Sequence, residues 1–260
     1  MFPIRDDNPQ ILTPVATITI VALNVIAWIL VQGLGTGGAL ANSICSFGLI
    51  PAQLMQLVPP GTELNLGAGN VCVLAGSGGW LTAVTSMFMH GSWMHIIGNL
   101  WFLWIFGNNV EDAMGPLRFL VFYLLCGLVA AVFQVAADPA SQVPMVGASG
   151  AIGGVMGAYI LLYPRVSVHM LVFLGFYVTT FAVPAFLMLG YWFLVQVMSG
   201  VTTYGNEGGG VAFWAHVGGF VAGGFFVYLF RNKDLLDRHP YHGWQKNKSR
   251  NRNWHRIDRR

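Results

Sequence analysis

Charged residues are scarce in this chain. Of its 260 residues only 9% are charged and 55% are hydrophobic, and the mean hydropathy is +0.60. A soluble domain has about 25% charged residues, so a soluble fold of this composition could not cover its surface with polar groups. The shortage of charge excludes a soluble domain and indicates an integral membrane protein.

The sequence also lacks the motifs of several hydrolase classes. It has no H-E-x-x-H zinc motif, and no long apolar run contains an aspartate pair. "GASGA" around Ser149 is not the G-x-S-x-G turn of soluble hydrolases. His90, His95 and Asn99 could form a metal site, but only the last two share a helix face, and no Cys, Asp or Glu is placed to join them. We therefore expect no metal and no cofactor.

Long apolar runs are abundant, and about 20 such residues suffice for a helix to cross the hydrocarbon. We predict an all-α polytopic membrane protein with six spanning helices, at residues 12–34, 92–110, 117–137, 148–164, 176–198 and 209–230. The first run is too long for a cleavable signal peptide. The expected organisation is a short N-terminus (1–11), one membrane domain (12–230) with an external loop (35–78), and a basic tail (231–260).

The cationic residues predict the orientation of these helices. Arg5, Arg118 and Arg165 lie before the first span and in the second and fourth loops, and the other ten Lys and Arg follow residue 230. The first, third and fifth loops have none. By the positive-inside rule, both termini should face the cytoplasm.

The tail is basic with interleaved aromatic residues, a pattern that also occurs in nucleic-acid-binding segments. We favour a mostly disordered cytoplasmic tail that sets the topology and contacts anionic lipid. No nucleic-acid partner is expected.

Polar residues at membrane depth gather near one face of the bilayer. The even-numbered helices should begin at the outer side. His95 and Asn99 share a face at the start of the second helix, Ser149 begins the fourth, and His216 lies about two turns into the sixth. Polar side chains inside a membrane are functional candidates by default.

Glycines surround the serine, at Gly147, Gly150, Gly153 and Gly154. Small residues recur at spacing four along both helices, at Ser149/Gly153/Gly157, Gly150/Gly154/Ala158 and Ala215/Gly219/Gly223. Such stripes let helix backbones approach closely in lipid, although they are often purely structural. Here they would bring the serine hydroxyl to an imidazole that can take its proton.

Over residues 46–231 the sequence resembles the rhomboid intramembrane serine proteases of the compact bacterial six-helix type. The resemblance lies in "HIIGN" within "MFMHGSWMHIIGNLWFLWIFGNNVEDAMG", in "GASG" and in "AHVGG", in this order. It implies a dyad of Ser149 as nucleophile and His216 as general base. It also implies that His95, Asn99 and the Ser149 backbone amide bind the oxyanion, with Gly147 and Gly150 in support.

The resemblance carries further expectations. His90 would order water or the neighbouring loop, and Glu111 would be structural. Some members have a tyrosine where this chain has Gly153, and the first loop has no arginine for the Trp-Arg pair of other members. The expected location is the bacterial inner (plasma) membrane, with the site facing the external side. The expected partners are transmembrane protein substrates and the lipid bilayer, and no oligomeric state is predicted.

Two other functions fit parts of the pattern. A catalytically inactive relative would bind membrane clients, but such proteins usually lack the serine or the histidine. A small transporter or channel would need polar residues across the bilayer, whereas here they cluster near one face and no inverted repeat is visible.

Cysteine is rare, with three residues in the chain. Cys45 and Cys72 both fall in the external loop, where thiols are oxidised, and we predict a disulfide between them. The alternative is two free thiols whose geometry forbids a bond. Cys126 lies within the third predicted helix and is expected to be an ordinary small apolar residue.

Overall fold

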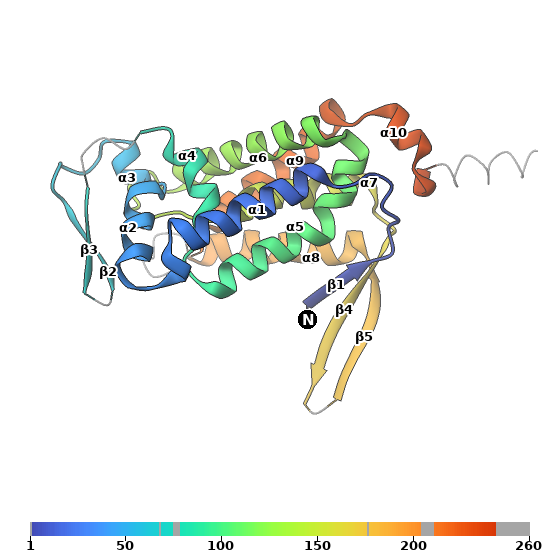
Figure 1. The fold of residues 1–260 in the computed structure, drawn as a ribbon, viewed down its shortest axis with the longest axis horizontal. Helices are drawn as coiled ribbons and strands as arrows, with labels where there is room; N and C mark the ends of the chain where they lie inside the picture. The colour runs from blue at the N-terminus through green and yellow to red at the C-terminus, as the bar shows by residue number, and fades with distance from the viewer. Residues whose placement is uncertain (1, 68, 75–78, 176, 204–210, 243–260) are drawn as a thin grey trace, which may run out of the picture.

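The computed structural model describes residues 2–67, 69–74, 79–175, 177–203 and 211–242. Its long helices form one bundle, with shorter elements gathered at both ends (Figure 1). The helices are α1 (Val15–Leu30), α2 (Gly37–Phe47), α3 (Pro51–Leu54), α4 (Thr82–Thr85), α5 (Trp93–Met114), α6 (Pro116–Ala137), α7 (Ser149–Leu162), α8 (Ala185–Thr202), α9 (Phe213–Phe230) and α10 (Lys233–Arg238). The strands are β1 (Phe2–Asp6), β2 (Glu63–Gly67), β3 (Asn70–Val73), β4 (Ser167–Leu174) and β5 (Tyr177–Pro184).

Within the described residues, α6, α8 and α9 are long and apolar enough to cross a membrane. Helices α1 and α7 are apolar but have only 16 and 14 residues. Helix α5 has 22 residues, and its last turn carries Glu111 and Asp112. The chain is therefore a mostly helical membrane protein, and six spans with both termini cytoplasmic stay a prediction.

The all-α prediction is wrong, because the structure contains two small sheets, β1-β4-β5 and β2-β3. The predicted fifth span, 176–198, begins too early, since Tyr177–Pro184 is strand β5 and helix α8 starts at Ala185. Valine, threonine and aromatic residues in "YVTTFAV" favour a strand. Apolar content alone does not separate such a strand from a helix.

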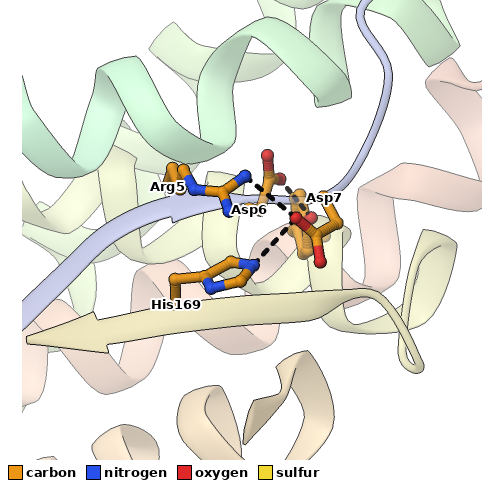
Figure 2. A network of polar contacts seen from close by, with 5 residues as sticks. Arg5, Asp6, Asp7 and His169 are labelled. Carbon is orange, nitrogen blue, oxygen red and sulfur yellow. Dashed lines mark hydrogen bonds and ion pairs between the residues drawn. The ribbon is translucent and has the colours of Figure 1, made fainter. Parts of the chain in front are cut away.

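The N-terminal segment is part of the first of these sheets. Strand β1 pairs antiparallel with β4, with Phe2 opposite Leu171. Just after β1, one Asp7 oxygen accepts hydrogen bonds from His169 Nε2 at 2.8 Å and from the Arg5 guanidinium at 3.1 Å (Figure 2). Residues 2–6 are thus attached to the β4–β5 hairpin rather than forming a separate extension.

Glu111 holds the start of α1. No side chain of its own caps that helix, so its first backbone N–H groups need other acceptors. The amides of Ala16 and Thr17 donate to the two Glu111 carboxylate oxygens at 2.9 and 2.8 Å, and the Thr17 hydroxyl donates at 2.8 Å. Glu111 is fully buried, and these bonds give it a structural task.

The segment between α1 and α5 is largely folded. The predicted loop 35–78 includes α2, α3 and the β2–β3 hairpin, and a disulfide joins Cys45 on α2 to Cys72 on β3. Cys126 is a buried free thiol on α6. The hairpin and α2 lie at the end of the bundle opposite α10 (Figure 1).

The predicted tail is ordered at its beginning. The amide of Asn232 donates to the Ala113 carbonyl at 2.8 Å, and His239 is buried against Tyr163, with ring centroids 5.1 Å apart. The boundary at 230 therefore lies too early for the folded unit. The part of the tail beyond residue 242 lies outside the described residues.

Helix α7 is the centre of the bundle and is packed by α5, α6, α8 and α9. Its contact with α9 is made by glycines on both helices. A Cβ atom at Gly219 would overlap the carbonyl of Gly150, and one at Gly223 would overlap the carbonyl of Gly154. The predicted close approach of these two helices through small residues is confirmed.

The first prediction concerns the disulfide. The crosslink spans 27 residues, and the chain-entropy model gives about 3–4 kcal/mol for a loop of that length. Alkylation of unfolded, unreduced protein should label Cys126 but neither Cys45 nor Cys72 in mass spectrometry. Replacing both by serine should lower the melting temperature. Label on both residues of the unreduced protein would contradict the pairing.

The second prediction concerns the attachment of β1. Burial raises the pKa of the Asp6 carboxyl from its ordinary 3.8 to about 6. A raised acid pKa means that protonation stabilises the docked state, and this stabilisation is lost as the pH rises through about 6.

We therefore expect the amides of residues 2–6 to exchange hydrogen more slowly at pH 5 than at pH 7.5, after correction for the intrinsic rate. Asp6→Asn should remove most of this difference. Equal corrected exchange at both pH values in the unmodified protein would show that Asp6 burial does not control the strand.

Candidate functional site

The backbone just before α7 requires a glycine at position 147. Gly147 has a φ of +125°, which L side chains rarely adopt, and its amide donates to the Ser86 carbonyl at 2.9 Å. A Cβ at this position would lie 2.6 Å from His95 Nε2. Gly147 thus lets the chain pass close to α5 and places Ser149 as the first residue of α7.

Ser149 lies next to His216 on α9. The distance between Ser149 Oγ and His216 Nε2 is 2.7 Å, which is the range that proton transfer requires. The neighbouring glycines make this possible, since a Cβ at Gly150 would come within 2.7 Å of Ala130 Cβ and one at Gly153 within 3.0 Å of the His216 carbonyl. The serine and histidine are therefore brought together by backbone packing.

The other nitrogen of His216 faces α8. Its Nδ1 lies 2.7 Å from Gln196 Oε1, and a carbonyl oxygen can only accept, so Nδ1 carries the proton. Nε2 is then the acceptor for the Ser149 hydroxyl. The Trp192 ring packs on the imidazole, with centroids 5.8 Å apart and planes tilted by 38°.

His95 and Asn99 reach the same place from α5. The Gly91 amide donates to His95 Nδ1 at 3.3 Å, which leaves the proton on Nε2, the atom nearest Gly147. The Asn99 amide nitrogen is buried, has no partner among the described residues, and lies 3.5 Å from the position a Gly147 Cβ would take. Both side chains can donate hydrogen bonds to a group bound beside Ser149.

His90 packs against the His95 ring and helps to hold it in place. Its ring is fully buried and meets the His95 ring edge-on at 5.1 Å. Burial lowers the pKa of His90 to about 3, so the ring is neutral at physiological pH. Gln32 binds the His90 backbone twice, accepting from its N–H and donating to its carbonyl, both at 2.8 Å. His90 thus connects α1 to the residues next to His95.

The Ser149–His216 pair and the two side chains from α5 line a cavity of about 560 Å³. Its polar lining includes Ser149, His216, His95 and Asn99, and its apolar lining comes from α5, α6, α7 and α8. Within the described residues no cluster of three His, Cys, Asp or Glu could hold a metal ion. A cavity with a serine–histidine pair on one side and amide and imidazole donors on the other can carry out acyl transfer.

Sequence reasoning did not identify Trp192, Gln196 or Gln32. The signal for the first two was present, because they lie one turn apart on one face of an apolar predicted helix, and a polar residue at that depth is a candidate by default. Their target was not evident, because the position of α8 against α9 is a tertiary property.

Comparison with known proteins agrees with the geometry. The family model of the rhomboid domain matches residues 77–233. The chain is 33% identical over 154 residues to Rhomboid protease GluP of Bacillus subtilis (strain 168), covering 59% of this chain and 26% of that protein. It is 30% identical over 187 residues to Rhomboid-like protease 5 of Toxoplasma gondii, covering 67% and 20%.

A third relative is Rhomboid-like protein 11, chloroplastic, of Arabidopsis thaliana, with 37% identity over 83 residues, or 32% of this chain and 29% of that protein. The chain thus spans less than a third of the length of each of these relatives. The family match extends over more than half of the chain and includes every residue that lines the cavity, from Ala83 to His216. The protein belongs to the rhomboid family.

Proposed function

We propose that the chain is an intramembrane serine endopeptidase that works through a dyad of Ser149 and His216. The observation that carries the proposal is the 2.7 Å contact between Ser149 Oγ and the unprotonated Nε2 of His216. A serine hydroxyl is a weak nucleophile until a neighbouring base takes its proton. The rhomboid proteases among the relatives support the same reaction class.

The reaction follows from the positions of the protons. Ser149 Oγ attacks the carbonyl carbon of the peptide bond while its proton moves to His216 Nε2. The C–N bond then breaks, and His216 returns the proton to the leaving amine. Water attacks the resulting ester and gives a proton to the same nitrogen, which restores the Ser149 hydroxyl as the acid product leaves.

The negative charge on the carbonyl oxygen would be stabilised by three donors. These are His95 Nε2–H, the Asn99 amide and the backbone N–H of Ser149, which as a first-turn amide has no acceptor within its own helix. Donors already aimed at the developing charge need no rearrangement during the reaction. Asn99, whose amide nitrogen is otherwise unpaired within the described residues, gains a partner only when this oxygen is bound.

The substrate is proposed to be a transmembrane helix of another protein, cut near the outer leaflet of the bacterial inner membrane. The site lies at the end of the bundle that holds the Cys45–Cys72 segment, because Gly147 bonds Ser86 and Gln32 bonds His90. Helix α10 (Lys233–Arg238), which belongs to the first part of the basic tail, lies at the other end (Figure 1). The positive-inside rule then directs the site outward.

The third prediction tests the dyad. Ser149→Ala and His216→Ala should each remove cleavage of a single-pass substrate, because loss of either group costs roughly a million-fold in kcat in soluble serine proteases. Ser167→Ala, on β4 away from the cavity, is the matched control and should leave turnover unchanged. Undiminished cleavage by folded Ser149→Ala protein would end the serine-protease proposal, and no cleavage by the unmodified protein would favour the client-binding alternative.

The fourth prediction tests the oxyanion donors. Asn99→Ala and His95→Ala should each lower kcat by about 100- to 1,000-fold. Asn99→Ala should change the melting temperature little, because the lost amide nitrogen has no protein partner among the described residues. Asn109→Ala is the matched control on α5, since its amide donates to Asp6 at 2.9 Å, and it should lower stability but not kcat. A large stability loss with normal kcat for Asn99→Ala would assign Asn99 to the fold.

A further inference from the structure

Helix α8 places two side chains on His216, and the proposed dyad chemistry by itself does not require them. Gln196 is 8% exposed and its Oε1 lies 2.7 Å from His216 Nδ1. Trp192 is four residues earlier, so it projects from the same face of the helix, and its ring packs on the imidazole. One helix therefore holds both the edge and the face of this ring.

The glutamine needs an explanation because of its surroundings. Helix α8 carries no charged residue, and its sequence "AFLMLGYWFLVQVMSGVT" is predominantly apolar. A buried amide in such a position is costly unless it is hydrogen-bonded. Gln196 is hydrogen-bonded to His216, so its position is best explained by what it does to the imidazole.

That bond selects one of two tautomers. A neutral imidazole has a single N–H, and if the proton were on Nε2, His216 could not accept from the Ser149 hydroxyl. By accepting from Nδ1, Gln196 keeps the lone pair of Nε2 directed at Ser149. The amide oxygen also faces the ring when it becomes an imidazolium, where it stabilises the positive charge.

Trp192 on α8 packs on the face of the ring, whereas position 153 on α7 is a glycine and offers no side chain there. A Cβ at Gly153 would lie 3.0 Å from the His216 main-chain carbonyl. Trp192 is itself packed against Phe220 on α9, with ring centroids 6.1 Å apart. The imidazole is thus held between Gln196, Trp192 and Ser149.

We propose that Gln196 and Trp192 are positioning residues for the base, so that His216 can activate Ser149 only while α8 is docked against α9. This inference rests on the proposed dyad. Activation of Ser149 would then require α8 in its docked position. If the helix moved away, His216 would lose both the hydrogen bond that selects its tautomer and the ring contact that holds its plane. If α8 only controlled the entry of substrate, its displacement would not change the reactivity of Ser149.

The test separates activation of Ser149 from entry of substrate. A small fluorophosphonate reacts with an activated serine: Ser149 Oγ attacks phosphorus, the P–F bond breaks, fluoride leaves, and the proton goes to His216. Its second-order rate constant is measured on the purified full chain, beside kcat and KM for a single-pass substrate. Ser149→Ala defines the background.

The variants are Gln196→Leu, which removes the acceptor, and Gln196→Glu, which keeps an acceptor oxygen. Gln134→Leu is the matched control, since Gln134 on α6 also bonds α9, but at the Ala215 amide, 3.2 Å away. We expect Gln196→Leu to lower the labelling rate and kcat by about threefold to tenfold, the worth of one neutral hydrogen bond, with KM unchanged. Gln196→Glu should restore most of the rate, and Gln134→Leu should label at the normal rate.

Trp192 is tested in the same assay. Trp192→Ala should slow labelling, and Trp192→Phe, which keeps an aromatic ring, should recover most of it. Normal labelling by Gln196→Leu, with or without a defect in substrate cleavage, would overturn the inference, and so would an equal loss in Gln134→Leu. If the unmodified protein neither labels at Ser149 nor cleaves substrate, the proposed function itself fails.

Discussion

Helices α7 and α9 meet backbone to backbone, and the rest of the site depends on this contact. A Cβ added at Gly219 would meet main-chain atoms of Gly150, and one added at Gly223 would meet main-chain atoms of Gly154. Even a methyl group at these positions would push the helices apart. A hydrogen bond between a serine and an imidazole tolerates only a few tenths of an ångström. The glycines therefore set the separation at which Ser149 and His216 can meet.

Around that contact, the structure uses two histidines in opposite ways. His95 accepts from the Gly91 amide at Nδ1 and so presents a proton at Nε2. His216 donates from Nδ1 to Gln196 and so presents a lone pair at Nε2. An imidazole is thus a donor on one side of the cavity and an acceptor on the other, because a different group binds the Nδ1 atom of each histidine.

The polar bonds that hold the bundle lie toward its two ends. At one end Gln32 binds the His90 backbone and a disulfide ties α2 to β3. At the other end Glu111 binds the first amides of α1, and Asp6 accepts from Asn109 and from the Tyr159 hydroxyl. Among the described residues, the contacts between these two ends are mostly apolar or made by glycine. This division suits a membrane protein, since unsatisfied polar groups are most costly in hydrocarbon.

The sequence by itself determined the membrane character, the residues around Ser149 and the pairing of α7 with α9. Composition, four-residue spacing and helix direction are local or periodic properties, so they can be inferred from the amino-acid sequence without knowledge of the tertiary structure. They also predicted that His95, Asn99 and His216 would lie near the serine, and in the structure all four line one cavity. The pairing of Cys45 with Cys72 followed from their shared place in one loop.

Only the tertiary structure decided which side chains hold the histidine and where the strands lie. Gln196 meets His216 because of the rotation and depth of α8 against α9, which no spacing within α8 encodes. Strand β1 pairs with β4 across more than 160 residues, and β5 forms from a run whose apolar content equally suits a helix. In each case the partner is distant in the chain, and the free energy that selects it comes from packing and hydrogen bonds that exist only once the elements have assembled.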